Sequence, residues 1–172
     1  TLVDAFIHLK SILQNKPLKL MILGSTTPFT KNYLESVKSK LEQNKLLDQT
    51  IIKTNLTKED KFKYLSRASI LSVPATYGES FGLYIIEALA LGIPVVQPNH
   101  GAFPEIIEAT EGGLLCKPDD SNDLADKIHE LYNNPELRAK LGAQGKKKVV
   151  KGFNNHAMAK RVSELISTKC KN

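Results

Sequence analysis

The chain alternates helical and extended apolar patterns along its length. Over residues 2–14, apolar side chains recur every three or four positions, which predicts a helix with one buried face. The same spacing over residues 30–44 predicts a second helix whose buried face includes Tyr33, Val37 and Leu41. Short apolar runs between helical segments are typical of buried strands. Five such strands are expected, at residues 18–24, 50–53, 70–74, 94–98 and 113–117.

Helix caps and stops mark the remaining helices. Thr57 and Ser121 are expected to cap the helices that follow them, because short hydroxyl side chains accept hydrogen bonds from free amides at a helix start. Gly92 suits a left-handed helix stop, and Pro135 suits the first position of a helix. These signals predict helices over about 57–68, 82–91 and 121–133, another from 135, and a last one after 153.

The order of the elements predicts a single α/β domain with a parallel sheet. Helices of ten or more residues separate the strands, so successive strands need crossover connections and run parallel, with helices covering both faces of the sheet. Ligands of such sheets bind at the carboxyl ends of the strands. The loops expected at that edge are residues 24–27, 54–55, 75–80 and 99–102.

Composition is that of a globular protein of the cytoplasm. Of its 172 residues, 41% are apolar and 24% are charged, and no apolar run approaches 18 residues unbroken by glycine or proline. Cys116 and Cys170 lie far apart without metal-ligand spacing, which favours a reducing compartment over a disulfide framework. The four histidines are scattered, so we expect no bound metal. The chain enters directly on a helical pattern at Thr1, which suggests a fragment of a longer protein.

Positive charge is concentrated in the last part of the chain. Residues 138–172 hold ten lysines or arginines against one acid, Glu164, whereas residues 1–137 hold fourteen against seventeen acids. No aromatic residues interleave this charge in the manner of nucleic-acid-binding segments, and Phe153 is its only aromatic residue. Two interpretations stay open: a solvated helix face, or a peripheral contact with the anionic inner face of a membrane.

Glu87 is the only charged residue in the otherwise uncharged run 81–96. On a helix its neighbours would be Leu83, Ala90 and Leu91, all of them apolar. A buried carboxylate without partners costs several kcal/mol. Glu87 must therefore have a structural partner such as a lysine or an amide, lie exposed at an edge, or contact a ligand.

A second carboxylate, Glu79, precedes the same helix start. The amides of residues 80–83 are among the unpaired donors of that helix end, which attract an anion such as a phosphate. The two carboxylates would repel the phosphate and suit neutral sugar hydroxyls instead. A ligand with phosphates between two hydroxyl-bearing rings, a nucleoside diphosphate sugar, fits both features. Glu79 could equally be an ordinary exposed loop acid.

Four segments in order carry a family resemblance. They are ESFGLYIIE (residues 79–87), ALALGIPVV (88–96), GAFPEII (101–107) and EGGLLCKPDD (111–120). Together they resemble the carboxy-terminal, donor-binding domain of retaining GT-B glycosyltransferases of the glycosyltransferase 4 group, also called group 1 glycosyl transferases. The resemblance covers nearly the whole chain. It implies a Rossmann-like parallel sheet flanked by helices, the second half of a GT-B fold, with residues 1–172 forming one nucleotide-sugar-binding domain that lacks an amino-terminal acceptor domain.

The resemblance also implies roles for particular residues. Glu79 would be the catalytic residue, facing the transferred sugar and stabilising positive charge on its ring. Glu87 would accept hydrogen bonds from the ribose, and the amides of Phe81, Gly82 and Leu83 would hold the distal phosphate. The full set of donor-binding residues is Gly24, Ser25, Ser80, Phe81, Gly82, Leu83 and Glu87. The family usually needs no metal or other cofactor, and the isolated half would be inactive.

Two departures from the family pattern limit what the resemblance implies. The chain has GSTTP at 24–28 in place of a Gly-x-Gly turn, and IIKTNL at 51–56 in place of a strand that ends in glycine. The base, the sugar, the acceptor and the linkage therefore stay open. A sugar-nucleotide epimerase, a glycogen or starch synthase-like enzyme, and a non-catalytic α/β interaction module are the alternatives.

Overall fold

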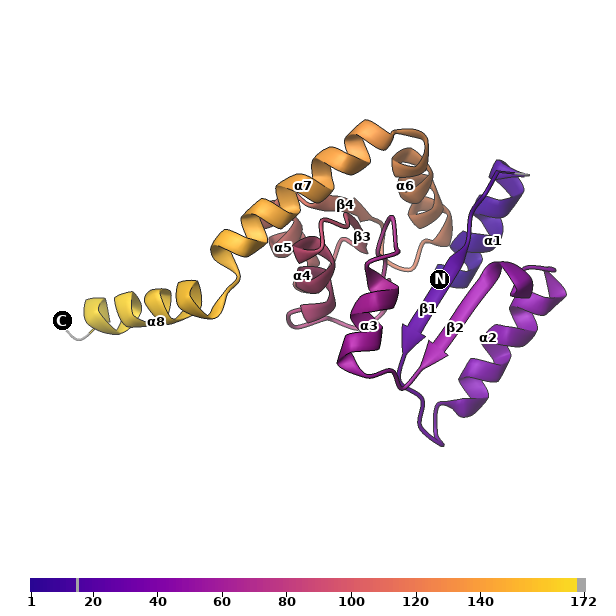
Figure 1. Cartoon of the computed structure of the whole chain (residues 1–172), viewed down its shortest axis with the longest axis horizontal. Helices are drawn as coiled ribbons and strands as arrows, with labels where there is room; N and C mark the ends of the chain where they lie inside the picture. Colours follow the sequence, from indigo (N-terminus) through magenta and orange to yellow (C-terminus); the bar gives the residue numbers. More distant parts are fainter. Residues whose placement is uncertain (15, 170–172) are drawn as a thin grey trace.

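The computed structural model describes residues 1–14 and 16–169 and has the expected alternation of helices and strands (Figure 1). The elements are α1 (Leu2–Leu13), β1 (Leu20–Gly24), α2 (Lys31–Gln43), the short 3-10 helix η1 (Leu47–Gln49), β2 (Thr50–Thr54), α3 (Lys58–Leu65), α4 (Leu83–Ala90), β3 (Val95–Pro98), α5 (Phe103–Thr110), β4 (Gly113–Cys116), α6 (Ser121–Asn133), α7 (Pro135–Gly152) and α8 (Asn155–Lys169). The α/β class and the positions of the predicted helices are confirmed.

The strands form two parallel pairs. Leu20 lies opposite Thr50 in the pair β1–β2, and Val95 lies opposite Gly113 in the pair β3–β4. The predicted parallel direction is confirmed for these four strands, but they form two separate two-stranded sheets and not the single sheet that was expected. The loops after β1, β2 and β3 contribute to the candidate site, whereas the loop that carries Glu79 follows the segment at residues 70–74.

The strand expected at residues 70–74 is reduced to one bridge, between Leu71 and Val95. The Leu71 amide donates to Pro94, but two residues later the amide of Val73 donates to the side chain of Gln97 at 3.2 Å instead of to a neighbouring backbone. Pro74 then supplies no donor at all. A side-chain acceptor and a proline together end the ladder early.

Two helix starts differ from expectation. The cap of α6 is Asp120 and not Ser121, because the Asp120 carboxylate accepts the amides of Asn122 and Asp123 at 3.0 and 2.9 Å. The sequence analysis also predicted no helix where α5 lies, although Pro104 occupies its first turn. The predicted cap of α3 is confirmed: the Thr57 hydroxyl accepts the amide of Asp60.

The core is divided into three clusters of buried side chains. The largest packs α4, β3 and α5 against α7 and contains Ile85, Val95, Phe103 and Val149. A second joins α1 to α6 and the strands β3 and β4, and a third joins α1 to β1 and α2. Leu41 lies in the third cluster as expected, whereas Tyr33, predicted on the same buried face, is 73% exposed.

Cys116 lies in the second cluster, where burial above all, with a contribution from the nearby Asp123 carboxylate, raises the pKa of its thiol to about 11. Cys170 lies outside the described residues. Within residues 1–14 and 16–169, no helix is both long enough and apolar enough to span a bilayer.

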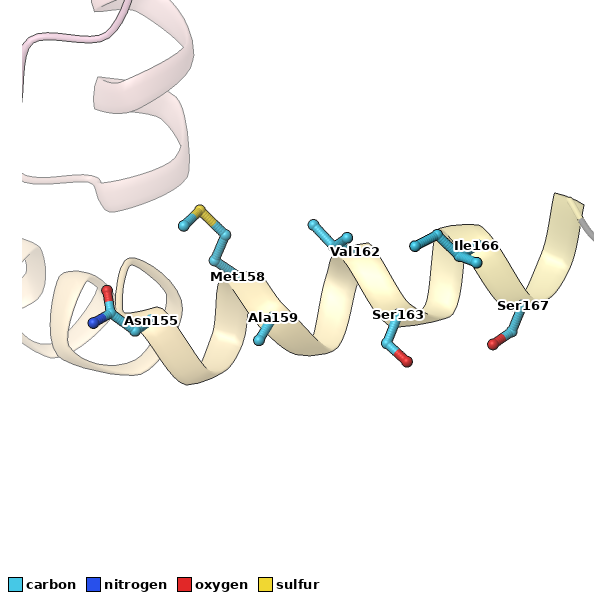
Figure 2. Close-up of a pocket in the computed structure, with 7 residues that line it drawn as sticks. All are labelled: Asn155, Met158, Ala159, Val162, Ser163, Ile166 and Ser167. Carbon is cyan, nitrogen blue, oxygen red and sulfur yellow. The ribbon is translucent and has the colours of Figure 1, made fainter.

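Helix α8 projects from the rest of the molecule (Figure 1). Met158, Val162 and Ile166 stand on one side of it, whereas Ser163 and Ser167 point the other way (Figure 2). All three apolar side chains are about half or more exposed. The body of the fold therefore ends with α7, which packs on α4 and α5.

Candidate functional site

The loops at the carboxyl ends of β1 and β2 are joined by Asn55. Its amide donates to the carbonyl of Gly24 at 2.9 Å, and its side-chain oxygen accepts the amide of Thr26 at 2.9 Å. Gly24 and Ser25, two predicted donor contacts, are exposed on this loop. An alanine side chain at Gly24 would meet no atom within 4 Å. The first loop is therefore held by Asn55 and leaves open space above Gly24.

The loop that carries Glu79 is held by the loop after β3. The amide of Ala102 donates to the Glu79 carbonyl at 2.9 Å. Gly101 adopts a φ of +57°, and a side chain there would approach the backbone N and O of Glu79 to 2.9 Å. Only glycine tolerates both the left-handed backbone and this approach. Glu79 is thus placed by a direct backbone contact between two segments predicted at the same sheet edge.

The Glu79 carboxylate accepts hydrogen bonds from the start of α4. Its Oε1 accepts the amides of Ser80 at 2.9 Å and Phe81 at 3.3 Å, and its Oε2 accepts the hydroxyl of Tyr84 at 3.1 Å. These donors, the Phe81 amide foremost, hold the pKa of Glu79 below its usual range against an opposing effect of burial. Tyr84 was not recognised from the sequence, although its position five residues after Glu79 and in the first turn of the helix could have indicated it.

Some of the amides that were predicted to hold the distal phosphate are therefore occupied by hydrogen bonds within the chain. The Phe81 amide donates to Glu79 and the Gly82 amide also helps to stabilise that carboxylate, whereas the amide of Leu83 has no hydrogen-bond acceptor among the described residues. Gly82 caps α4 with a φ of +72°, a left-handed conformation that glycine favours. An incoming anion would meet the exposed Leu83 first, since Gly82 is buried and its amide faces Glu79. The side chain of Ser80 is exposed beside them.

Glu87 lies one helical turn beyond Leu83, about 6 Å along the axis of α4. Its two oxygens accept from the ammonium of Lys61 on α3, at 2.7 and 2.8 Å. The Glu87 side chain is 26% exposed and that of Lys61 is 39% exposed. Of the alternatives left open by the sequence, the lysine partner is the one present, and the carboxylate still reaches solvent.

The two glutamates thus lie at the same helix, Glu79 in the loop that leads into α4 and Glu87 in the helix itself. Gly24 and Ser25 lie on a different loop at the carboxyl ends of the strands. Among residues 1–14 and 16–169, no three His, Cys, Asp or Glu side chains are grouped to hold a metal ion. What the site offers is two carboxylates and a helix start with free amides, which together can bind hydroxyl groups and an anion.

The fold and this edge define an α/β domain whose candidate site lies at the carboxyl ends of parallel strands. The chain matches the model of the family Glycosyl transferases group 1 over residues 1–148 and belongs to that family. The GT-B assignment is thereby confirmed.

Several proteins resemble the chain over most of its length. N-acetyl-alpha-D-glucosaminyl L-malate synthase of Bacillus anthracis is 28% identical over 147 residues, which are 86% of this chain and 36% of the synthase. The carboxy-terminal domain of the group 1 glycosyl transferase LpcC of Francisella tularensis superposes with a TM-score of 0.75 at 28% identity, over 88% of this chain and 79% of that domain.

A third similar structure supports the fold alone. It is Anabaena HepE in complex with UDP, with a TM-score of 0.84 at 20% identity, over 97% of this chain and 44% of HepE. The chain spans about a third or less of the length of the curated relatives it matches, from 36% of the Bacillus anthracis synthase down to 9% of a sucrose-phosphate synthase of rice.

Proposed function

We propose that this chain is the donor-binding part of a retaining glycosyltransferase, which moves a sugar from a nucleoside diphosphate sugar to an acceptor hydroxyl. The observation that carries the proposal is the pair of carboxylates at α4: Glu79 lies in the loop just before the helix and accepts amides there, and Glu87 lies in the helix, one turn beyond Leu83. Membership of a glycosyltransferase family supports the reaction class. The interaction-module alternative has no comparable support from the site.

The donor would lie across the start of α4. Its distal phosphate would accept the amide of Leu83, which has no acceptor among the described residues, and those of Phe81 and Gly82 where Glu79 releases them. The hydroxyls of its ribose would donate to Glu87. Gly24, Ser25 and Ser80 would line the same space, since all three are exposed at this edge.

Glu79 would act on the transferred sugar. The donors around it keep the carboxylate ionised, and an ionised carboxylate stabilises the positive charge that develops on a sugar ring as the bond to the leaving diphosphate breaks. The acceptor would attack from the face that the diphosphate leaves, which retains the configuration. No metal or other cofactor is part of this proposal.

The proposal includes a partner domain and a subcellular localisation. An amino-terminal acceptor domain of the same protein would complete the cleft, and the protein would act in the cytoplasm, at the inner face of a membrane. Exposed lysines of α7 such as Lys147 and Lys151 would attract anionic lipid. Sedimentation with vesicles tests this contact: equal binding to anionic and zwitterionic vesicles, or none to either, would refute it.

Binding of nucleotide sugars tests the function directly. UDP-, GDP- and ADP-glucose are each added to a solution of the protein. A donor that binds the folded state raises the melting temperature of the protein. The Glu87→Ala variant should then bind the best donor about tenfold more weakly, because hydrogen bonds to a charged group contribute about 1.5–3 kcal/mol. Titration calorimetry measures the change.

Glu108→Ala is the matched control, since Glu108 is an exposed glutamate of α5. It should leave the affinity unchanged. A chain that binds none of the three donors would refute the proposed function. So would a folded Glu87→Ala variant with the affinity of the wild type.

A further inference from the structure

Among the described residues, Lys61 is the one that contacts the Glu87 carboxylate from another helix. The residues are 26 positions apart in the chain, and the ammonium lies almost equally far from the two carboxylate oxygens, at 2.7 and 2.8 Å. Other ion pairs of α3 are local, such as the exposed contact of Lys63 with Asp60 three residues earlier. Lys61 therefore differs from its neighbours in reaching across to α4.

The backbone of Lys61 is fixed from both sides. The Thr57 hydroxyl caps the start of α3, and Lys61 follows in the first turn, its amide donating to the Thr57 carbonyl at 2.9 Å. Leu65 is buried in the same core cluster as α4, with Phe62 packed against it. The ammonium also lies 5.0 Å from the centre of the Phe62 ring, within the range of a cation–π contact. A lysine held this way restricts the orientation of the carboxylate it binds.

The symmetric contact leaves Glu87 able to bind a ligand. A carboxylate has about four acceptor positions, and Lys61 occupies one on each oxygen, so one on each oxygen remains for a hydroxyl donor. The two vicinal hydroxyls of a ribose present two such donors. The lysine also balances the carboxylate charge when a ligand covers the pair, which reduces the cost of excluding water.

We propose that Lys61 is a positioning residue that orients the Glu87 carboxylate toward the ribose hydroxyls of the donor and so makes the site selective for ribonucleotides. The inference rests on the proposed function. The proposed function requires only that Glu87 binds the ribose. The inference adds that Lys61 acts through Glu87.

Binding of ribose and dideoxyribose nucleotides separates this role from a direct contact with phosphate. UDP, GDP and ADP and their 2′,3′-dideoxy analogues are titrated into the wild type and Lys61→Met by calorimetry. The variant should bind the preferred ribonucleotide about three- to tenfold more weakly, less than the loss expected for Glu87→Ala, because the carboxylate remains but is no longer oriented. It should bind the dideoxy analogue with less than about a twofold change, since no hydroxyl remains for Glu87 to accept.

Three further variants serve as controls. Lys63→Met removes the same charge from the same helix without touching Glu87, and should leave both affinities unchanged. Lys61→Arg should restore part of the ribonucleotide affinity, because a guanidinium also donates to both oxygens. In a Glu87→Gln background, Lys61→Met should have almost no additional effect, since contacting residues are not additive.

The outcomes distinguish the inference from the proposed function. A wild-type chain that binds no nucleotide overturns both. Wild-type binding that Lys61→Met leaves unchanged, or weakens equally for ribose and dideoxyribose nucleotides, overturns the positioning role and leaves the proposed function intact. An undiminished effect of Lys61→Met in the Glu87→Gln background has the same consequence, because the lysine would then act on the phosphates.

Discussion

The two site glutamates have the same charge but different partners. Glu79 accepts from neutral groups, two amides and a phenol, whereas Glu87 is paired with the ammonium of Lys61. Neutral donors stabilise a carboxylate without cancelling its charge, and an ion pair cancels most of it. Glu79 thus retains a net negative charge that can face a developing cation, while Glu87 is suited to accept hydrogen bonds from neutral hydroxyls.

The Tyr84→Phe variant should raise the pKa of Glu79. The phenol stabilises the ionised carboxylate from 3.1 Å, so its removal shifts the pKa upward toward the ordinary glutamate range, while the Phe81 amide keeps part of the original depression. The pKa of the Tyr84 phenol is itself raised, by burial first and by Glu79 second. A carbon-13 NMR titration of the Glu79 carboxyl measures the change.

The lowered pKa of folded Glu79 makes the stability of the protein depend on pH. The contribution of this residue to folding is present above its unfolded pKa and is lost as the pH falls through the folded value. In Tyr84→Phe the contribution should be smaller, and its loss should be complete at a higher pH, because the folded pKa lies closer to the unfolded one. Tyr33→Phe, a change at an exposed tyrosine of α2, is the control. An unchanged Glu79 pKa in Tyr84→Phe would contradict the assigned hydrogen bond.

Single residues of the site could be recognised from the sequence, but their partners could not. Glu87 is conspicuous because it interrupts an uncharged run, and Glu79 because it precedes a helix start. Lys61 belongs to a helix in which Lys58 and Lys63 are also present, and nothing in the local pattern distinguishes it from them. The contact depends on how α3 and α4 pack, which no periodicity encodes.

At the scale of elements, helix starts depend on which of two adjacent polar residues turns its side chain toward the free amides. At α6 both Asp120 and Ser121 are of the right type, and the backbone of Asp120 is the extended one that a capping residue adopts. Its carboxylate also carries a negative charge to the positive end of the helix. The hydroxyl of Ser121 makes no such contact among the described residues.

Exchange of these two residues for alanine should have unequal effects. Asp120→Ala should lower the free energy of unfolding by about 1 kcal/mol, the usual loss for a side-chain cap, because two amides lose their acceptor. Ser121→Ala, one residue further on, should change it by less than about 0.5 kcal/mol. Urea unfolding followed by circular dichroism measures both, and equal effects would contradict the assigned cap.

Element type was predictable where one pattern dominated, and not where two signals conflicted. Helices α1, α6 and α7 have long periodic faces and were predicted. The run at 70–74 has strand composition, but Gln97, distant in sequence, accepts the hydrogen bond that would have extended the ladder. Gly101 just before α5 and Pro104 in its first turn are together typical of a loop. The burial of α5 against β4 and α7 outweighs that signal.

At the scale of the whole molecule, α7 closes the body through contacts at glycines. A side chain at Gly142 would collide with the carbonyl of Gly92, and one at Gly145 would approach the side chain of Leu89 to 2.6 Å. Val149 continues this contact into the largest core cluster, and Phe153 packs at its margin. The body is thus completed before α8 begins, which the sequence could not show because α7 and α8 have similar composition.

Deletion of residues 155–172 should therefore leave the stability of the body almost unchanged. Met158, Val162, Leu165 and Ile166 of α8 are each about half or more exposed, so their removal loses little buried apolar area. The free energy of unfolding in urea should change by less than about 1 kcal/mol. Gly145→Ala in the full chain should by contrast lower it by about 1–3 kcal/mol, because the added methyl group overpacks the contact of α7 with Leu89. A truncated chain that unfolds at markedly lower urea than Gly145→Ala would show that α8 stabilises the body, against the exposure of its apolar side.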